Sequence, residues 1–345
     1  MFISTTIETD MKLKTAVITG ATGQDGALLA EFLLKQNYRV IAPTRLNPDK
    51  SNLQTLDIHS HKNLQFLIYE NWYDFDNIIK KFQPHEIYHL AAMSHVGQSH
   101  DNPEMVFNVN THWTINLLQA IKVHSPRSKL FFASSCEIFN CSIDRPVIET
   151  DEKLPSNPYG ISKLSAHLMV EYYRKVNGLF ACNGILFNHE SKLRAPSFVS
   201  KKICREVARI VKHGGGPLSL GNIEAKKDWG YAPDYIKAFH AMLQQPKPDD
   251  FIVSTGELHS VKDMVNCAFT ALDYKISWRG SDLECQALNA NNEVVVNIDE
   301  RFFRPLDNRF LIGNNSKAQQ LLNFTNSTPF SEWVKEMTLN ELTFS

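Results

Sequence analysis

The chain has 345 residues, and its 36 basic and 37 acidic side chains give a formal net charge of −1. This balance provides no overall electrostatic attraction for nucleic acid or for an anionic membrane. With 43% hydrophobic and 21% charged residues the chain can bury a large core, which excludes a disordered protein, and only 15 Gly and 15 Pro exclude a collagen-like one. The length allows one large α/β domain or two lobes.

Short apolar, β-branched runs alternate with longer amphipathic stretches through the first half of the chain. This alternation is typical of βαβ units and predicts an α/β fold with a doubly wound parallel sheet, the Rossmann arrangement. The predicted elements, in chain order, are strand Thr15–Thr19, helix Leu28–Gln36, strands Arg39–Ala42, Gln65–Tyr69 and Glu86–Leu90, helix Val109–Val123, strand Lys129–Ala133, helix Tyr159–Val176 and strand Phe180–Phe187.

The alternation becomes less regular after Asn188. The stretch from Lys192 to His213 is basic, a run of three glycines marks a turn before Pro217, and the tail is typical of short helices and strands. We therefore expect a smaller, mixed α/β C-terminal lobe. The predicted boundaries are 12–187, with 232–256 returning to it, for the first lobe, and 188–231 with 257–345 for the second.

The spacing of cysteines and histidines gives no sign of a disulfide scaffold or a metal site. Six cysteines are scattered without a CxxC pair, and the 13 histidines include no HExxH motif. The start of the chain lacks the basic segment and apolar run of a signal peptide, and no run of about 18 apolar residues could span a bilayer. We expect a cytoplasmic protein without a bound metal.

A glycine-rich loop follows the first predicted strand directly and opens the first helix. Its sequence is Gly20-Ala21-Thr22-Gly23-Gln24-Asp25-Gly26, with the spacing GxxGxxG. Glycines allow a tight turn and a close approach of the backbone to a pyrophosphate, whose charge then lies at the helix N-terminus. Because a strand precedes the loop and a helix follows it, the motif favours a dinucleotide site over an ordinary turn.

The end of the second predicted strand indicates which dinucleotide binds. In NAD-binding proteins an acidic residue about 20 positions after the loop usually bonds the ribose 2′-hydroxyl. No acidic residue lies between Arg39 and Pro48, and Arg45 stands just after the strand. Because a guanidinium can pair with a 2′-phosphate, we predict that the cofactor is NADP. The alternative is that Arg45 is a solvated surface charge.

Tyr159 and Lys163 form a YxxxK motif at the start of a predicted helix. The four-residue spacing places both side chains on one helix face, where a nearby ammonium favours the phenolate and lets the tyrosine act as a general base. Ser135 and Glu137 come just after a predicted parallel strand, at the edge where open α/β sheets place their chemistry. YxxxK alone is common by chance, and Glu137 alone could be a surface carboxylate.

Four features together resemble the extended short-chain dehydrogenase/reductase family. They are the glycine loop, the segment Leu90-Ala91-Ala92-Met93-Ser94, the serine before Glu137 and the YxxxK motif. Within that family, the phrases ITGATGQDG, NGILFNHES, SLGNIEAKKDWGYAPDY and STGELHSV are similar to those of the GDP-mannose 4,6-dehydratases. The resemblance extends from about Lys14 to near the C-terminus.

This resemblance implies a hydro-lyase that acts on GDP-mannose or a close GDP-sugar. Tyr159 would take the proton of the sugar 4-hydroxyl while a hydride leaves for NADP, and Ser135 would hydrogen-bond the same oxygen. Lys163 would lower the pKa of the tyrosine and hold the nicotinamide ribose. Glu137 would then remove the proton at carbon 5, water would leave from carbon 6, and the hydride would return there.

The resemblance also implies the binding residues and the assembly. For NADP the predicted residues are Gly20, Thr22, Gly23, Gln24, Asp25, Gly26, Arg45, Asn71, Leu90, Ala91, Ala92, Ser94, Tyr159, Lys163, His189 and Arg194. For the GDP-sugar they are Ser94, Asn188, Glu190, Asn222, Lys227 and Arg304. The family implies a homodimer or a homotetramer.

Two other functions stay open at this point. A GDP-4-keto-sugar reductase or 4-epimerase of the same family needs Tyr159 and Lys163 but has no use for a base at carbon 5, so Glu137 favours the dehydratase. A catalytically silent NADP-binding protein would be free to lose Ser135, Tyr159 or Lys163, and all three are present.

Overall fold

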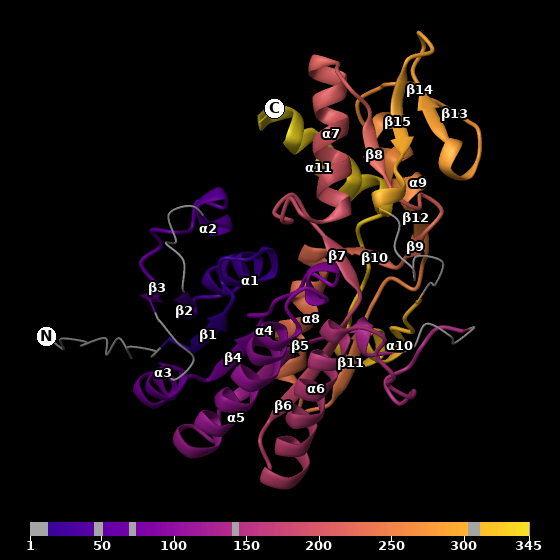
Figure 1. Cartoon of the computed structure of the whole chain (residues 1–345). Coiled ribbons are helices and arrows are strands. Elements are labelled where there is room, and N and C mark those ends of the chain that lie inside the picture. The colour runs from indigo at the N-terminus through magenta and orange to yellow at the C-terminus, as the bar shows by residue number, and fades with distance from the viewer. Residues whose placement is uncertain (1–12, 45–50, 69–73, 140–144, 303–310, 345) are drawn as a thin grey trace, which may run out of the picture.

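The computed structural model describes residues 13–44, 51–68, 74–139, 145–302 and 311–344 (Figure 1). The predicted site residues Arg45, Asn71 and Arg304 lie outside these ranges. Figure 1 shows a lower lobe built around a sheet and an upper lobe that carries the C-terminus. No helix within the described ranges combines the length and the apolar character that crossing a membrane requires.

A seven-stranded parallel sheet forms the first lobe, in the order β11-β6-β5-β4-β1-β2-β3. The predicted fold class is therefore confirmed. The strand order reverses between β1 and β4, and the carboxyl ends of the strands at such a point form the usual ligand crevice of this fold. The strands are β1 (Thr15–Thr19), β2 (Arg39–Thr44), β3 (Leu64–Ile68), β4 (Glu86–His89), β5 (Lys129–Ser135), β6 (Ala181–Leu186) and β11 (Asp250–Val253).

Helices cover both faces of this sheet because the side chains of each strand alternate between the faces. In β1, Ala16 and Ile18 join the apolar core formed with α1, α8 and α10, whereas Val17 joins the core formed with α3, α5 and α6. Burial on both faces explains the continuous apolar runs of the strands. The helices of this lobe are α1 (Gln24–Lys35), α2 (Asn52–Thr55), α3 (Asp74–Phe82), α4 (Pro103–Phe107), α5 (Trp113–His124), α6 (Pro158–Asn177), α8 (Ala232–Gln244) and α10 (Ser316–Leu322).

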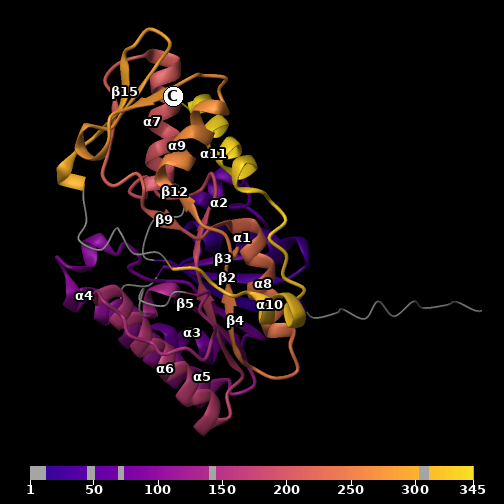
Figure 2. The same ribbon diagram turned by 90° about the vertical axis from the view of Figure 1, so that its right-hand side faces the viewer.

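The second lobe has an apolar core of its own. Its helices pack against one another and beside a four-stranded sheet in the order β13-β14-β15-β8 (Figure 2). The helices are α7 (Val199–His213), α9 (Val261–Thr270) and α11 (Phe330–Phe344). The strands are β8 (Leu218–Leu220), β13 (Ser277–Arg279), β14 (Gln286–Leu288) and β15 (Val294–Ile298), and two small sheets pair β7 (Asn188–Glu190) with β10 (Trp229–Tyr231) and β9 (Lys226–Lys227) with β12 (His259–Ser260). The exact boundaries between the lobes stay a prediction.

Helices α1 and α7 are among those that differ from the predicted elements. Helix α1 begins at Gln24, one turn before the predicted start, because its first turn is polar and apolar periodicity cannot detect it. The basic stretch after Lys192 contains the 15-residue helix α7. Its Ile203, Val207 and Ile210 follow helical spacing and are buried, while the basic residues between them hide this pattern in the sequence.

A buried polar cluster ties the end of β5 to α6, β6 and β11. Asp250 accepts hydrogen bonds from Arg174 Nη1 (2.8 Å) and Asn183 Nδ2 (2.9 Å). The Nε2 atom of His167 lies 3.4 Å from Asp250 Oδ2, and its Nδ1 atom lies 3.1 Å from the hydroxyl of Ser134. Burial acts to raise the pKa of Asp250, but His167 and Arg174 outweigh it, so the pKa of this carboxyl is held well below its usual range.

We expect Asp250→Asn to lower the free energy of unfolding at neutral pH by about 3 kcal/mol, because it leaves Arg174 buried without its charged partner. Since the folded-state pKa of Asp250 is depressed, its contribution is present above the unfolded pKa of about 3.9 and is lost as the pH falls through the folded pKa. Urea unfolding measured from neutral to acidic pH should therefore show that the free energy of unfolding falls less steeply with decreasing pH in the variant than in the wild type. The matched control is Asp249→Asn, whose side chain is 52% exposed beside Lys317; an equal loss in both variants would contradict the prediction.

Candidate active site

The glycine loop turns tightly between β1 and α1 and lies directly against the segment that follows β4. Gly20 has a positive φ of 75°, and a Cβ atom there would stand 2.8 Å from the backbone nitrogen of Ala91. A Cβ atom at Gly26 would stand 2.2 Å from the carbonyl oxygen of Gly20. Gly23 caps α1 without a side-chain hydrogen bond, so the first N–H groups of this helix remain as donors for an anion. The residues present therefore fit a dinucleotide diphosphate.

We expect Gly26→Ala to weaken NADP binding by about 10–100-fold, because overpacking against a backbone carbonyl costs about 1–3 kcal/mol. Titration of the purified protein with NADP, followed by calorimetry, measures the dissociation constant directly. Gly216→Ala is the matched control, since a Cβ atom at that position meets open space. Equal affinity in the Gly26 variant and the wild type would show that the loop does not bind the cofactor.

A buried polar cluster connects the glycine loop to β7. Gln24 Nε2 donates to the carbonyl oxygen of His189 (3.0 Å), and Ser191 donates to Gln24 Oε1 (2.9 Å). Asp25 Oδ2 lies 2.9 Å from His189 Nε2. Burial disfavours the charged forms of both side chains, but the attraction between Asp25 and His189 outweighs it. The pKa of Asp25 is therefore lowered and the pKa of His189 is raised, and Arg194 also acts to lower the pKa of Asp25. Asp25 thus favours the protonated form of His189 beside the first turn of α1.

The segment after β4, which contains the predicted Leu90, Ala91, Ala92 and Ser94, runs past the glycine loop. The N–H of Ala91 donates to the hydroxyl of Thr19 (3.2 Å). Asn110 braces the same segment, since its Oδ1 accepts from the N–H of Met93 (2.8 Å) and its Nδ2 donates to Ser162 on α6 (3.0 Å). Asn110 lies in a π-helical turn, Asn108–His112, and sequence periodicity did not mark it.

Three predicted catalytic residues come together where β5 ends and α6 begins. Ser135 is the last residue of β5, and its hydroxyl accepts from the N–H of Glu137 (3.2 Å). Tyr159, in the first turn of α6, is hydrogen-bonded to the Ser135 side chain and lies within the electrostatic reach of Glu137. A hydroxyl, a carboxylate and a phenol therefore meet at the carboxyl edge of the central sheet, as the strand and helix positions predict.

Lys163 lies one turn further along α6, and its hydrogen-bond partner is a backbone carbonyl rather than Tyr159. Its Nζ atom donates to the carbonyl oxygen of Ala133 (2.7 Å) and stands over the ring of Phe132, 4.9 Å from its centroid. Burial lowers the pKa of this amine to about 7. The sequence predicts a lowered pKa for Tyr159, and this is wrong: burial raises the pKa of Tyr159, against the opposing effect of the Ser135 hydrogen bond, because a phenolate loses solvation there.

Two residues of this site escaped the sequence reasoning. Asn157 caps α6, with Oδ1 accepting from the N–H of Gly160 (2.8 Å), and its Nδ2 atom donates to Glu137 Oε2 (2.8 Å). At Gly160 a Cβ atom would stand 2.3 Å from the carbonyl oxygen of Glu137. The sequence before Tyr159 indicates only a cap; the contact to a carboxylate 20 residues away depends on the tertiary fold.

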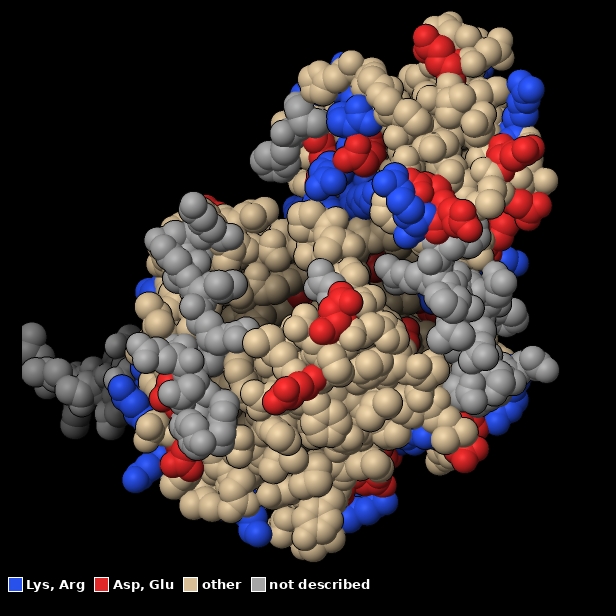
Figure 3. All heavy atoms as spheres, in the orientation of Figure 1, with Lys and Arg blue, Asp and Glu red and all other residues tan. Residues whose placement is uncertain are grey.

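Ser94 follows β4 in the first lobe, and the other predicted GDP-sugar residues that the structure describes lie in the second lobe or at its junction with the first. The Ser200 hydroxyl donates to Glu190 Oε2 (2.6 Å), and the same oxygen lies 3.0 Å from Arg194 Nε. The guanidinium of Arg194 stacks on the ring of Phe198. Asn188 opens β7, Asn222 follows β8 and Lys227 is in β9. Figure 3 shows basic side chains gathered on the part of the second lobe that meets the first. Such charge suits a diphosphate.

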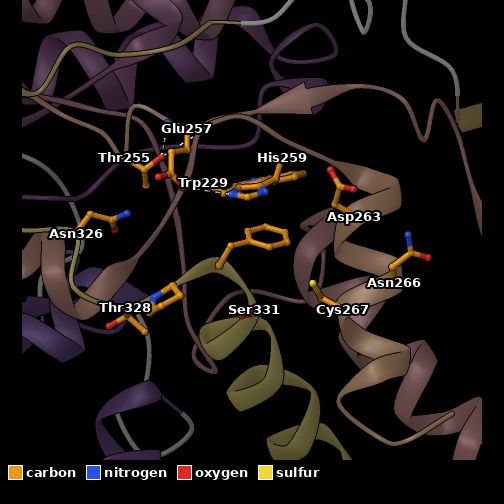
Figure 4. A pocket seen from close by; sticks show the side chains of 12 residues that line it. Trp229, Thr255, Glu257, His259, Asp263, Asn266, Cys267, Asn326, Thr328 and Ser331 are labelled. Atoms are coloured by element: carbon orange, nitrogen blue, oxygen red, sulfur yellow. Dashed lines mark hydrogen bonds and ion pairs between the residues drawn. The ribbon is translucent and has the colours of Figure 1, made fainter. Parts of the chain in front are cut away.

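A separate cavity of about 580 Å³ lies in the second lobe, between β12, α9 and the start of α11 (Figure 4). The His259 ring stacks on Phe330 at 3.9 Å, and Trp229 stacks on the same ring at 6.3 Å. None of the residues that line this cavity belongs to the predicted site. Within the described ranges, no group of three or more His, Cys, Asp and Glu side chains could hold a metal ion.

Sequence comparison places the chain among known proteins. The sequence model of a family described as GDP-mannose 4,6 dehydratase matches residues 17–337. The chain is 40% identical over 343 residues to the GDP-mannose 4,6 dehydratase of Dictyostelium discoideum, covering 96% of both chains. It is also 40% identical over 336 residues to the protein of that name from Homo sapiens, covering 93% of this chain and 90% of the human one.

Solved structures share the fold at lower sequence identity. A UDP-glucose 4-epimerase from Thermotoga maritima superposes with a TM-score of 0.80 at 20% identity, covering 96% of this chain and 99% of that one. A dTDP-glucose 4,6-dehydratase from Bacillus anthracis superposes with a TM-score of 0.77 at 18% identity, covering 95% and 96%. These likenesses show the fold alone and carry no assignment of the reaction.

Proposed function

Because the chain belongs to the GDP-mannose 4,6-dehydratase family, we propose that it is a hydro-lyase that converts GDP-mannose, or a close GDP-sugar, to the GDP-4-keto-6-deoxy sugar. The observation that carries the assignment is the meeting of Ser135, Glu137 and Tyr159 at one edge of the sheet. This set provides an acceptor for a hydroxyl proton and a second base for a carbon acid. Both are needed in a 4,6-dehydration.

Each of these side chains has one task. Tyr159 takes the proton of the sugar 4-hydroxyl, and Ser135 holds the same oxygen while it becomes a ketone. The ketone acidifies the hydrogen on carbon 5, and Glu137 removes it as a proton. The electrons of that bond form a double bond to carbon 6, whose hydroxyl takes up a proton and leaves as water. A proton then returns to carbon 5, so the net change is the loss of one water.

The cofactor is NADP; when bound, it would supply hydride transfer from carbon 4 to carbon 6 of the sugar, and its positive ring would favour an ionised Tyr159. The glycine loop, the N-terminus of α1 and the segment after β4 would hold its diphosphate and ribose. His189, whose protonated form Asp25 favours, lies beside this loop. Arg45 stays a prediction for the 2′-phosphate.

The GDP part of the substrate would lie against the second lobe, near Asn188, Glu190, Asn222 and Lys227. The arrangement suits a reaction in which the first lobe holds the redox cofactor and the second holds the nucleotide. A redox-only reductase or 4-epimerase is not favoured, because the family match and Glu137 both point to dehydration. A silent protein is not favoured either, since the catalytic side chains are present and in contact.

We also propose that the chain forms a homodimer or homotetramer through α6. This helix exposes Ile161 (46%), Leu168 (50%), Tyr172 (50%) and Val176 (63%). Their spacing places all four on one side of the helix, opposite to the buried residues that pack on the sheet. An exposed apolar stripe of this kind is typical of a helix that packs against another chain.

Incubation of the purified protein with GDP-mannose in deuterated water tests the proposed function. Mass spectrometry should show the loss of one water, and NMR should show a ketone at carbon 4 and a solvent deuterium at carbon 5. A product that keeps all its oxygen atoms, or whose configuration alone has changed at carbon 4, would instead identify a redox or epimerase reaction.

A further inference from the structure

Asn157 connects the two segments that carry the proposed bases. It lies two residues before Tyr159, it is 5% exposed, and it is the N-cap residue of α6 with extended backbone angles. Its Oδ1 atom accepts from the N–H of Gly160 and its Nδ2 atom donates to Glu137 Oε2, both at 2.8 Å. The side chain of Asn157 therefore accepts a hydrogen bond from a free N–H group at the start of α6 and also donates one to the carboxylate that follows β5.

The orientation of the Asn157 amide follows from the cap. An N-cap side chain must present an acceptor to the helix N–H groups, so the oxygen faces Gly160 and the NH₂ group faces Glu137. If the amide were reversed, its NH₂ group would face the N–H of Gly160, donor against donor. Its oxygen would then face the carboxylate of Glu137, acceptor against acceptor. Each contact thus enforces the other, and a hydrogen bond to an ionised carboxylate is stronger than a neutral one.

The backbone at Gly160 keeps the two segments in register. Because a Cβ atom there would stand 2.3 Å from the carbonyl oxygen of Glu137, only glycine lets the first turn of α6 pack this closely on the turn Cys136–Ile138. The distance between Asn157 and Glu137 is therefore held by main-chain packing as well as by the side-chain bond.

Resting on the proposed function, we infer that Asn157 is a positioning residue for the base Glu137, which it orients toward carbon 5 of the sugar. A base must be held within hydrogen-bond reach of its proton, and it is commonly oriented by a third group. A displacement of about 1 Å can cost about 100-fold in rate. Asn157 therefore affects the rate of water loss, through the position of Glu137. It does not take part in the oxidation at carbon 4, which depends on Tyr159 and Ser135.

Two substitutions separate this role from helix capping. Serine and aspartate are both good N-cap residues, so Asn157→Ser and Asn157→Asp keep the cap. The serine side chain is too short to make both bonds, and the aspartate presents only acceptors to Glu137. We expect both variants to fold, to oxidise carbon 4 at nearly the wild-type rate, and to exchange the carbon 5 hydrogen about 10–100-fold more slowly.

Single-turnover reactions with GDP-mannose, quenched and read by mass spectrometry, distinguish the steps. In the Asn157 variants the oxidised GDP-4-keto-hexose that still carries its 6-hydroxyl should accumulate. In a Glu137→Gln background, Asn157→Ser should cause no further loss, because the two residues act as one unit. Unfolding midpoints measured in parallel report on the cap alone.

Either of two results would overturn the inference. If both variants slowed the oxidation at carbon 4 and the hydrogen exchange at carbon 5 equally, Asn157 would act by holding α6 and Tyr159 in place. If hydrogen exchange at carbon 5 were unchanged in both variants, Asn157 would have no role in orienting Glu137. A failure of the proposed function is recognised separately, because the wild-type protein itself would then release no dehydrated product.

Discussion

Replacement of Glu137 by Gln will stop the loss of water while leaving the oxidation at carbon 4 in place. Gln keeps the shape and an acceptor for Asn157 Nδ2, so the fold should be unaffected. It cannot take the proton from carbon 5, and loss of a general base costs about 10²–10⁴-fold. Product formation and deuterium uptake at carbon 5, followed by mass spectrometry, should both fall by this factor.

The control for this variant is Glu152→Gln, which changes an exposed carboxylate in the segment before α6. It should retain the wild-type rate. Undiminished dehydration by the Glu137 variant would remove the reason for preferring a dehydratase over a reductase or 4-epimerase of the same fold.

Replacement of Tyr159 by Phe will block the reaction before any ketone forms. The variant loses the acceptor for the 4-hydroxyl proton, so the turnover of GDP-mannose should fall by about 10²–10⁴-fold. The free energy of unfolding should change by about 1 kcal/mol or less, because the hydrogen bond to Ser135 is lost but no charge is left buried. Rapid quenching should detect neither an oxidised sugar nor deuterium at carbon 5.

Tyr274→Phe serves as the matched control, since it removes a phenolic hydroxyl from the second lobe, where that hydroxyl accepts from Asn289 Nδ2. The Tyr159 and Glu137 variants should also differ from each other: only the second accumulates the oxidised, hydrated sugar. Accumulation of that compound by the Tyr159 variant would show that another group takes the first proton.

The sheet and the glycine loop could be predicted from local sequence, because both depend on short patterns. Strands buried on two faces appear as continuous apolar runs, and β1, β2, β5 and β6 lie within a few residues of their predicted ends. Gly20 and Gly26 are required by contacts of under 3 Å with nearby backbone. Helix α7 was missed because basic residues interrupt its apolar face.

The candidate site could be predicted as a set of residues but not as a set of contacts. A four-residue spacing identified Tyr159 and Lys163, yet the spacing does not show that Lys163 donates to Ala133 or that burial raises the pKa of Tyr159. The bond between Asn157 and Glu137 has no local signal, since it forms only when α6 packs on the end of β5. The assignments of Arg45, Asn71 and Arg304 stay predictions.

The central claim is that the hydrogen removed from carbon 4 is the one that arrives at carbon 6, so that the loss of one water is the only net change. Reaction of the purified protein with GDP-mannose carrying deuterium at carbon 4 tests this most directly. The account predicts a dehydrated product with a ketone at carbon 4 and the deuterium at carbon 6, in ordinary water. Deuterium that remains at carbon 4, or that is lost to the solvent, would contradict it.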